Sequence, residues 1–210
     1  MIKIKDFEID AAIFDMDGTL LDSLSVWTDL AQTFLESKGV EFSSELCEKM
    51  KAMSIQESAV FLKNELEVCD SSEEIINGVR ESLIKFYAGE AKFKEGAYEF
   101  LEKLKEAGVK MCICTANDEK LAYLALKANK AEGFFSDIIC MGKHNPKAYD
   151  TCLDVLNAKK ETCMVFEDAY YATKTAKEAG YKVCGVYDKH EKEDIKPFCD
   201  IYIDSFNEIL

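Results

Sequence analysis

The sequence predicts an α/β protein whose three-layer core is a mostly parallel sheet with helices on both faces, with a small all-helical cap inserted after the first strand. Two observations predict this arrangement. From residue 93 onward, short apolar runs alternate with helical patterns, which is typical of βαβ units. Residues 24–88, in contrast, contain only helical patterns and follow directly on an apolar strand-like run.

The first strand is the apolar run over residues 9–14. In the segment after it, apolar residues recur at spacings of three and four from Leu24 until Gly39 ends the pattern. The string Ser71-Ser72-Glu73-Glu74 resembles a capping box at the start of a later helix. Four helices are therefore expected in the cap, over residues 24–38, 44–50, 55–66 and 72–87.

The remaining elements belong to the core. Five further strands are expected, over residues 109–114, 138–141, 162–166, 182–186 and 200–203. The helices that alternate with them are expected over residues 98–107, 118–129, 146–156 and 169–179. The predicted core domain therefore comprises residues 1–21 and 92–210, and the predicted cap domain comprises residues 22–91. We expect the hinges between them at residues 18–23 and 88–96.

Composition excludes several kinds of partner. The formal net charge of −14 repels nucleic acid and anionic lipid surfaces. No apolar stretch approaches the ~20 residues that span a bilayer, and the N-terminus lacks a signal-peptide pattern. The nine cysteines include no CxxC pair and fit a reducing compartment. We therefore expect a cytoplasmic protein that binds neither nucleic acid nor membranes. The sequence does not specify the oligomeric state, for which our working expectation is a monomer.

Two aspartates end the first predicted strand. Asp15 and Asp17 are one residue apart, so in a strand both side chains would point the same way, and two carboxylates aimed together repel each other. A cation bound between the two carboxylates would explain the pair. So would separate catalytic roles, in which one carboxylate is a nucleophile and the other transfers a proton. The simpler alternative is an ordinary turn, where aspartate is common. Gly18 would let the backbone approach a ligand closely.

Polar residues also follow three other predicted strands. Because chemistry collects beyond the carboxyl ends of parallel strands, these residues are expected to lie together. They are Thr115, Ala116 and Asn117 after the second strand, Gly142 and Lys143 after the third, and Glu167 and Asp168 after the fourth. Carboxylates beside a hydroxyl and a lysine predict a Mg²⁺ site next to an anion site.

With these residues in place, the chain resembles the haloacid dehalogenase superfamily of phosphotransferases, in its capped branch of small-metabolite phosphatases and β-phosphoglucomutase. Asp15-Met16-Asp17-Gly18-Thr19 is similar to the first motif of that family, Thr115 to the second, and Glu167-Asp168 to the fourth. The third motif is a lysine, and both Lys143 and Lys147 are available in the string K-H-N-P-K. We favour Lys143 because it follows the strand end directly.

The resemblance implies a Rossmann-like core, Mg²⁺ as cofactor and a role for each motif residue. Asp15 is the expected nucleophile, forming an aspartyl-phosphate, and Asp17 is the expected acid and base. The metal is expected at the Asp15 carboxylate, the Asp17 backbone carbonyl and Asp168, with Glu167 either a further ligand or a support. The expected phosphate-binding groups are the hydroxyl of Thr115, the ammonium of Lys143, the backbone N–H groups of Met16 to Thr19, and the segment Ala116-Asn117.

The resemblance also sets the expected function, which is Mg²⁺-dependent hydrolysis of a small phosphorylated metabolite such as a sugar, polyol or glycolate phosphate. The alternative is a β-phosphoglucomutase-like phosphotransferase. Such mutases carry a histidine where this chain has Trp27, which favours the phosphatase. Dehalogenation is disfavoured because Asp17 and Asp168 are both present, and a non-catalytic binding role is disfavoured because every catalytic position is filled. Two roles stay open: Trp27 is either hinge packing or a substrate platform, and residues 50–56 are either a specificity loop or a simple turn.

Overall fold

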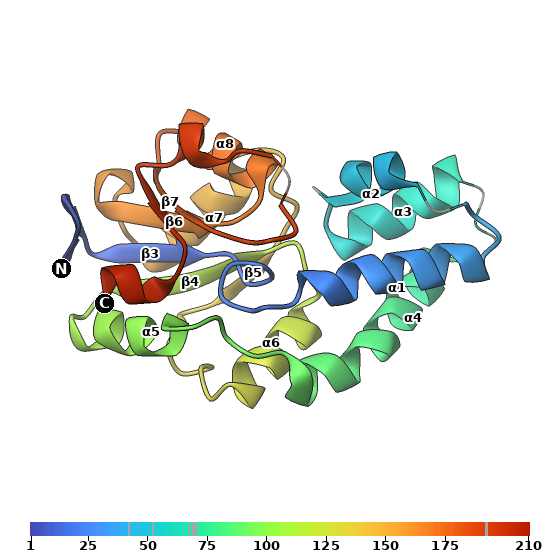
Figure 1. Ribbon diagram of the computed structural model, residues 1–210, viewed down its shortest axis with the longest axis horizontal. Helices are drawn as coiled ribbons and strands as arrows, with labels where there is room; N and C mark the ends of the chain where they lie inside the picture. Colours follow the sequence, from blue (N-terminus) through green and yellow to red (C-terminus); the bar gives the residue numbers. More distant parts are fainter. Residues whose placement is uncertain (42, 52, 67, 69–70, 192) are drawn as a thin grey trace.

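A computed structural model of the protein describes residues 1–41, 43–51, 53–66, 68, 71–191 and 193–210. It consists of an α/β core and a helical cap, which lies at the right in Figure 1. The core is built on one six-stranded parallel sheet with the strand order β5-β4-β3-β6-β7-β8. Its strands are β3 (Ala11–Phe14), β4 (Lys110–Thr115), β5 (Ile138–Cys140), β6 (Cys163–Glu167), β7 (Lys182–Val186) and β8 (Ile201–Ile203).

The expected first strand is divided in the structure. Ile9 ends β2 (Phe7–Ile9), which pairs antiparallel with β1 (Ile2–Ile4), and β3 begins only at Ala11. The expected start of the strand at residue 9 was therefore wrong. Two strands of three residues each are too short to give a recognisable period, so the hairpin left no pattern to read.

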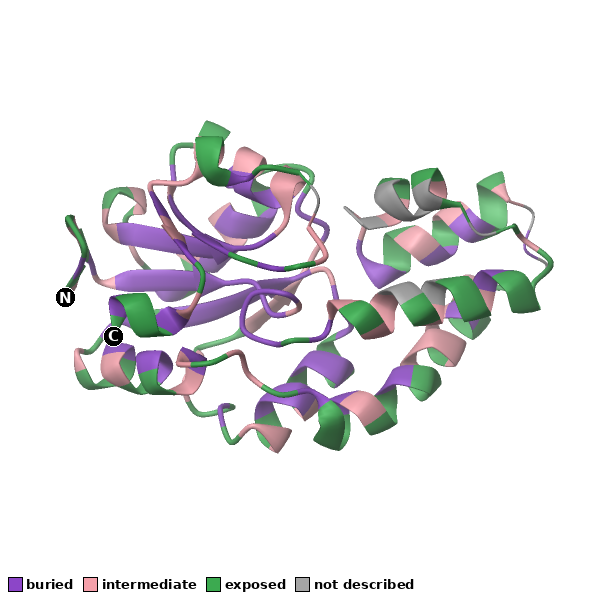
Figure 2. Ribbon diagram, in the orientation of Figure 1, coloured by how far each residue is buried: buried purple, intermediate pink, exposed green. Residues whose placement is uncertain are grey.

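Helices cover both faces of the sheet, because successive residues of each strand point to opposite sides. Ala12 and Phe14 face the layer of α5 (Ala97–Glu106) and α6 (Glu119–Ala128), where Phe14 stacks on Phe166 with ring centroids 4.4 Å apart. Ala11 and Ile13 face the layer of α7 (Lys147–Leu156) and α8 (Tyr170–Glu178). Strands β3 and β6 are accordingly buried along their whole length (Figure 2).

The described residues of the cap form four α-helices and a core of their own. They are α1 (Leu24–Ser37), α2 (Ser44–Lys51), α3 (Ile55–Glu65) and α4 (Ser72–Lys85). Capping boxes begin α3 at Ser54 and α4 at Ser71, where the serine hydroxyl accepts from a backbone N–H three residues later. The buried residues of this small core are Leu35, Ala59, Leu62, Val68 and Ile75. The predicted fold class, an α/β core with a helical insertion after the first strand of the sheet, is confirmed.

One unpredicted element joins the cap to the core. Directly after α4, residues Phe86–Glu90 form a π-helical turn, η1, which packs against α6. Insertions of this kind often occur at functional sites, and nothing in the sequence distinguishes them from a continuing α-helix. The remaining short helices are the 3₁₀ turns η2 (Lys160–Thr162), η3 (Lys196–Phe198) and η4 (Phe206–Ile209).

The two segments that connect cap and core lie side by side. Leu21 forms an antiparallel bridge with Phe93, and the backbone N–H of Lys94 donates to the carbonyl of Leu20 at 2.7 Å. The expected domain boundaries, at residues 21/22 and 91/92, fall in these paired segments and stay a prediction.

The cap also contacts the core beyond these segments. The backbone N–H of Ile55, at the start of α3, donates to the carbonyl of Ala116 at 3.2 Å. Arg80 of α4 forms a two-point ion pair with Asp118, at 3.1 and 2.7 Å, and Asp118 in turn caps α6. The cap is therefore held against the loop that follows β4, where part of the expected site lies.

Among the described residues, the cysteines are structural. All seven whose side chains the structure describes carry free thiols. Cys112, Cys114, Cys152 and Cys163 pack in the layer between the sheet and α7–α8, where burial raises the pKa of Cys163 to about 12. No helix in the described part of the chain combines the length and apolar character needed to cross a membrane.

Candidate active site

The carboxyl ends of the three central strands carry the expected acidic and hydroxyl side chains. Asp15 directly follows β3, Thr115 ends β4, and Glu167 ends β6, and all three are buried. Strands β4 and β6 pair with β3 on either side, so these side chains come from neighbouring positions along one edge of the sheet. The sheet topology thus brings together residues that are about 50 to 150 positions apart in the chain.

Three buried carboxylates form a compact acidic group. One oxygen from each of Asp15, Glu167 and Asp168 lies within 4.8 Å of the other two. Burial, together with the neighbouring carboxylates, raises the pKa of Asp168 well above its usual range, and burial raises that of Glu167 to about 7. The Oε2 atom of Glu167 is buried and has no hydrogen-bond partner. An all-oxygen donor set with one unpaired buried oxygen fits a divalent cation such as Mg²⁺.

Lys143 places a positive charge beside two of these three carboxylates. Its Nζ lies 2.7 Å from Oδ1 of Asp15 and 2.5 Å from Oε1 of Glu167, and its side chain is 2% exposed. Burial alone would lower the pKa of Lys143, but the two carboxylates outweigh it and raise that pKa well above its usual value. Tyr149 also donates to Oε1 of Glu167, at 3.1 Å. Lys147, the competing lysine of the third motif, is exposed on α7, which supports the choice of Lys143.

The loop after Asp15 wraps closely around Asp168. The hydroxyl of Thr19 donates to Oδ1 of Asp168 at 2.7 Å, and a Cβ added to Gly18 would lie 2.3 Å from Oδ2 of the same carboxylate. Gly18 also has a φ of 83°, which L-residues rarely adopt. The backbone N–H of Gly18 donates to the carbonyl of Leu21 at 2.9 Å. This N–H was expected to bind phosphate, but in the structure it makes a hydrogen bond within the loop.

Asp17 lies apart from the acidic group in a cage of hydrogen-bond donors. Its Oδ1 accepts from the hydroxyl of Ser23 at 2.6 Å and from that of Tyr87 at 2.5 Å, and its Oδ2 accepts from the amide of Asn117 at 2.8 Å. Burial raises the pKa of Asp17, whereas these three donors lower it. Trp27 reaches the cage through Tyr87, which accepts a hydrogen bond from its indole nitrogen at 2.7 Å.

The loop after β4 contains the remaining expected residues. The hydroxyl oxygen of Thr115 accepts from the backbone N–H of Asn117 at 3.1 Å, so its own proton can be donated elsewhere. Asn117, expected to bind phosphate, uses its side-chain amide to hold Asp17 instead. The carbonyl of Ala116 accepts from the cap at Ile55, and the side chain of Met16 is buried in the main core.

Sequence reasoning assigned no role to three residues of the site, Ser23, Tyr87 and Tyr149. Ser23 and Tyr87 belong to the two connections between cap and core, and Tyr149 lies on α7. Each contributes one hydroxyl group, and Tyr87 stands in no motif. Ser23 and Tyr149 had available signals, since Ser23 is close to Asp17 in the chain and Tyr149 follows Lys143 in the spacing of the third motif.

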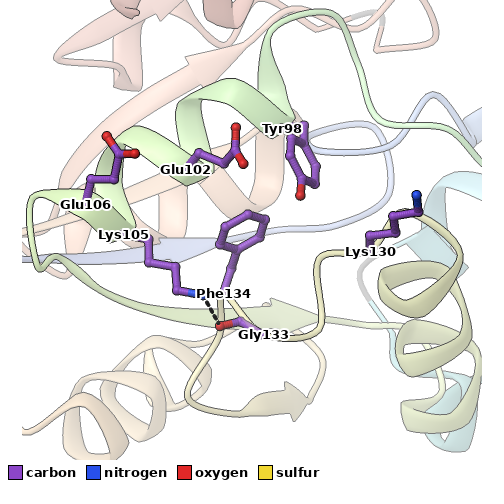
Figure 3. Close-up of a pocket in the computed structure, with 7 residues that line it drawn as sticks. All are labelled: Tyr98, Glu102, Lys105, Glu106, Lys130, Gly133 and Phe134. Atoms are coloured by element: carbon purple, nitrogen blue, oxygen red, sulfur yellow. Dashed lines mark hydrogen bonds between the residues drawn. The ribbon is translucent and has the colours of Figure 1, made fainter.

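Two pockets lie outside the strand ends. A groove of about 620 Å³ is lined by cap residues, including Met53 and Gln56 of the expected specificity loop, and by His144 of the core. Ala52, within that loop, lies outside the described residues. The second pocket, of about 250 Å³, lies between α5 and residues 130–134 and contains none of the expected site residues (Figure 3).

Fold and site together define a capped α/β enzyme with a buried acidic centre at the edge of its sheet. The chain belongs to the haloacid dehalogenase-like hydrolase family, whose model matches residues 12–186. The family predicted from the sequence motifs is therefore confirmed, and so is the class of enzyme, a phosphatase of this family.

Known proteins resemble the chain over most of its length. A phosphorylated carbohydrates phosphatase of Thermotoga maritima is 29% identical over 177 residues, which are 82% of this chain and 82% of that protein. Among solved structures, CbbY of Rhodobacter sphaeroides in complex with phosphate superposes with a TM-score of 0.78 at 21% identity, covering 94% of this chain and 95% of the other. β-Phosphoglucomutase of Clostridium difficile superposes with a TM-score of 0.75 at 18% identity, covering 96% and 93%. At such identities these two structures support the fold alone.

Proposed function

We propose that the protein hydrolyses a small phosphorylated carbohydrate, or a related polyol or glycolate phosphate, with Mg²⁺ and through an aspartyl-phosphate on Asp15. The observation that carries this proposal is the position of Asp15. Its carboxylate is paired with Lys143 and lies within 4.8 Å of two further buried carboxylates. A nucleophilic carboxylate beside both a fixed cation and a cation-binding group is the arrangement that attack on an anionic phosphoryl group requires.

The chain's own residues can divide the reaction into two steps. Asp15 attacks phosphorus and the leaving alcohol departs, which forms an acyl phosphate. Asp17 gives its proton to the leaving oxygen and later takes one from the water that releases phosphate. Lys143 offsets the charge of the phosphoryl oxygens, and the free proton of the Thr115 hydroxyl serves as a further donor to them.

The metal would be held by Asp15 and Asp168, with the backbone carbonyl of Asp17 as a third ligand. Glu167 would be either a fourth ligand or a support, because its Oε1 is taken by Lys143 while its Oε2 has no partner. A bound Mg²⁺ supplies charge that allows an anionic nucleophile to approach an anionic phosphate.

The substrate class rests on two lines of support. The Thermotoga relative is described as acting on phosphorylated carbohydrates and matches 82% of this chain. The cap is held against the loop after β4 through Ile55 and Arg80, and a cap that closes over the site would favour a small molecule over a polymer.

A mutase is the second candidate, because the motif residues also resemble those of the β-phosphoglucomutase branch of the family. Trp27 weighs against it, since its indole N–H is engaged with Tyr87 and can only donate a hydrogen bond, so Trp27 cannot accept and return a proton as an acid–base catalyst does. Conversion of β-glucose 1-phosphate to glucose 6-phosphate, measured beside phosphate release, separates the two activities.

The proposal is tested by phosphate release from a panel of sugar, polyol and glycolate phosphates. We expect turnover of at least one of them with Mg²⁺, its loss in EDTA, and its recovery when Mg²⁺ is restored. Hydrolysis that is unchanged by EDTA, or an absence of turnover across the whole panel and on p-nitrophenyl phosphate, would contradict the proposal.

Thr19→Val is expected to weaken the apparent Mg²⁺ affinity by about 10- to 100-fold, because it removes the hydroxyl that orients Asp168. The measurement is activity against Mg²⁺ concentration. Thr151→Val is the matched control, since that hydroxyl bonds only a helix carbonyl, that of Lys147, on α7. An unchanged Mg²⁺ dependence in Thr19→Val would remove Asp168 from the proposed ligand set.

A further inference from the structure

Tyr87 is a fully buried residue with a hydroxyl aimed at Asp17, and neither the sequence motifs nor the family match assigns it a role. It lies in η1, the π-helical turn that ends the cap. We propose that Tyr87, oriented by Trp27, is a positioning residue that fixes the Asp17 carboxylate and determines which of its two oxygens exchanges a proton with the substrate. This inference rests on the proposed function, in which Asp17 is the acid and base.

The direction of each hydrogen bond is determined by chemistry. The indole nitrogen of Trp27 can only donate, so at 2.7 Å the Tyr87 oxygen must accept from it. The single phenolic proton of Tyr87 is then directed to Oδ1 of Asp17, 2.5 Å away.

Counting acceptor positions shows what this arrangement does to Asp17. A carboxylate has about four lone-pair sites, two on each oxygen. Oδ1 uses both of its sites, for Ser23 at 2.6 Å and for Tyr87. Oδ2 uses one site, for the amide of Asn117 at 2.8 Å. Counting the hydrogen bonds that the described residues make, the site left open is on Oδ2, so Oδ2 is the oxygen that can carry a proton to the leaving group.

The donors come from three parts of the chain that meet at Asp17. Ser23 and Trp27 lie at the start of α1 in the first connection to the cap, Tyr87 lies at the start of the second, and Asn117 follows β4 in the core. Because the two connections are themselves paired, through Leu21 and Phe93, the cage assembles only when both are in place. The orientation of Asp17 is thereby tied to the position of the cap.

The competing explanation is that Tyr87 only packs. Its ring contacts Trp27 and Phe86, with centroids 6.4 and 5.2 Å away. Tyr87→Phe keeps this ring and removes only the hydroxyl. Tyr181→Phe is a matched control, because Tyr181 is also buried and donates to an aspartate, Asp150, at 2.6 Å, but it lies on the opposite side of the sheet, in the layer of α7 and α8.

The test compares two esters of similar shape, phenyl phosphate and p-nitrophenyl phosphate. The phenol leaving group, with a pKa of about 10 like that of tyrosine, needs a proton from the enzyme, whereas the nitrophenolate ion leaves readily without one. kcat/KM includes every step up to departure of the leaving group, so it reports the donation of this proton.

A positioned acid contributes about 10²- to 10⁴-fold to the rate, so we expect Tyr87→Phe to lower kcat/KM for phenyl phosphate by about 10-fold or more. For p-nitrophenyl phosphate, which needs no proton from the enzyme, we expect kcat/KM to fall by less than about 3-fold. Trp27→Phe, which removes the indole donor, is expected to change the ratio in the same direction. Tyr181→Phe is expected to leave the ratio unchanged. An equal fall for both esters in Tyr87→Phe and Trp27→Phe would overturn the inference and leave Tyr87 with a packing role.

Asp17→Asn distinguishes the failure of this inference from the failure of the proposed function. We expect it to discriminate between the two esters more strongly than Tyr87→Phe does. If Asp17→Asn affects both esters equally, Asp17 is not the acid, and the proposed mechanism and this inference are both wrong. If Asp17→Asn lowers kcat/KM more for phenyl phosphate than for p-nitrophenyl phosphate, but Tyr87→Phe and Trp27→Phe lower it equally for both esters, only this inference is wrong.

Discussion

Asp15→Asn is expected to lower kcat/KM for any substrate of the enzyme by about 10⁴-fold or more, because an amide cannot form the acyl phosphate. The variant should fold as well as the wild type. It loses the ion pair with Lys143, but it also relieves the repulsion of Asp15 from Glu167 and Asp168. Phosphate release and thermal unfolding, measured on the same sample, separate the two effects.

Asp150→Asn is the control for this substitution. Asp150 also accepts hydrogen bonds from a lysine and a tyrosine, Lys160 and Tyr181, but it lies on α7 away from the acidic group. We expect its activity to stay within a few-fold of the wild type. Activity of Asp15→Asn near the wild-type level would mean that the nucleophile has been assigned to the wrong residue.

Lys143→Met is expected to lower activity by about 10³-fold, the effect of removing a preorganised electrostatic group. It should also lower the free energy of unfolding in EDTA by about 3–5 kcal/mol at neutral pH, because it leaves the buried carboxylates of Asp15 and Glu167 without their cation. Urea unfolding monitored by circular dichroism measures the second effect.

The stability loss in Lys143→Met should depend on pH in a definite direction. The pKa of Glu167 is raised by burial to about 7, above its value in the unfolded chain, so the native state binds the extra proton and stability falls as pH rises through 7. Without Lys143 the pKa of Glu167 should rise further. The deficit relative to wild type is therefore expected to shrink at pH 5 and to grow at pH 8.

Lys147→Met is the matched control for both effects. Lys147 is the other lysine of the third motif and lies exposed on α7, so its loss should change neither activity nor stability appreciably. A larger loss of activity in Lys147→Met than in Lys143→Met would reverse the choice between the two lysines.

The fold could be predicted from the sequence where an element had a clear period or cap. The core strands and the four cap helices lie within a few residues of their expected positions, and the Ser71 capping box is present as expected. The β1–β2 hairpin and the π-helical turn at Phe86–Glu90 were not predicted. The first is too short to show a period, and the second differs from an α-helix only in its hydrogen bonds.

The candidate site divides in the same way. Residues at strand ends were predictable, because in a parallel sheet the strand order alone brings Asp15, Thr115 and Glu167 to one edge. The partners of Asp17 were not predictable, because Tyr87 reaches it across 70 residues from an irregular turn. Asn117 was assigned to the phosphate, and its contact with Asp17 depends on a side-chain direction that a sequence does not specify.

The central claim is that Asp15 carries the phosphoryl group during turnover. It is tested most directly in Asp17→Asn, which lacks the base for the second step but should still be phosphorylated by p-nitrophenyl phosphate with Mg²⁺, because nitrophenolate leaves without a proton. Acid quench followed by peptide mass spectrometry should find one phosphoryl group per chain, on Asp15, formed with a matching burst of nitrophenol. Nitrophenol release in this variant with no phosphoryl group on the enzyme, or with the group on another residue, would contradict the account.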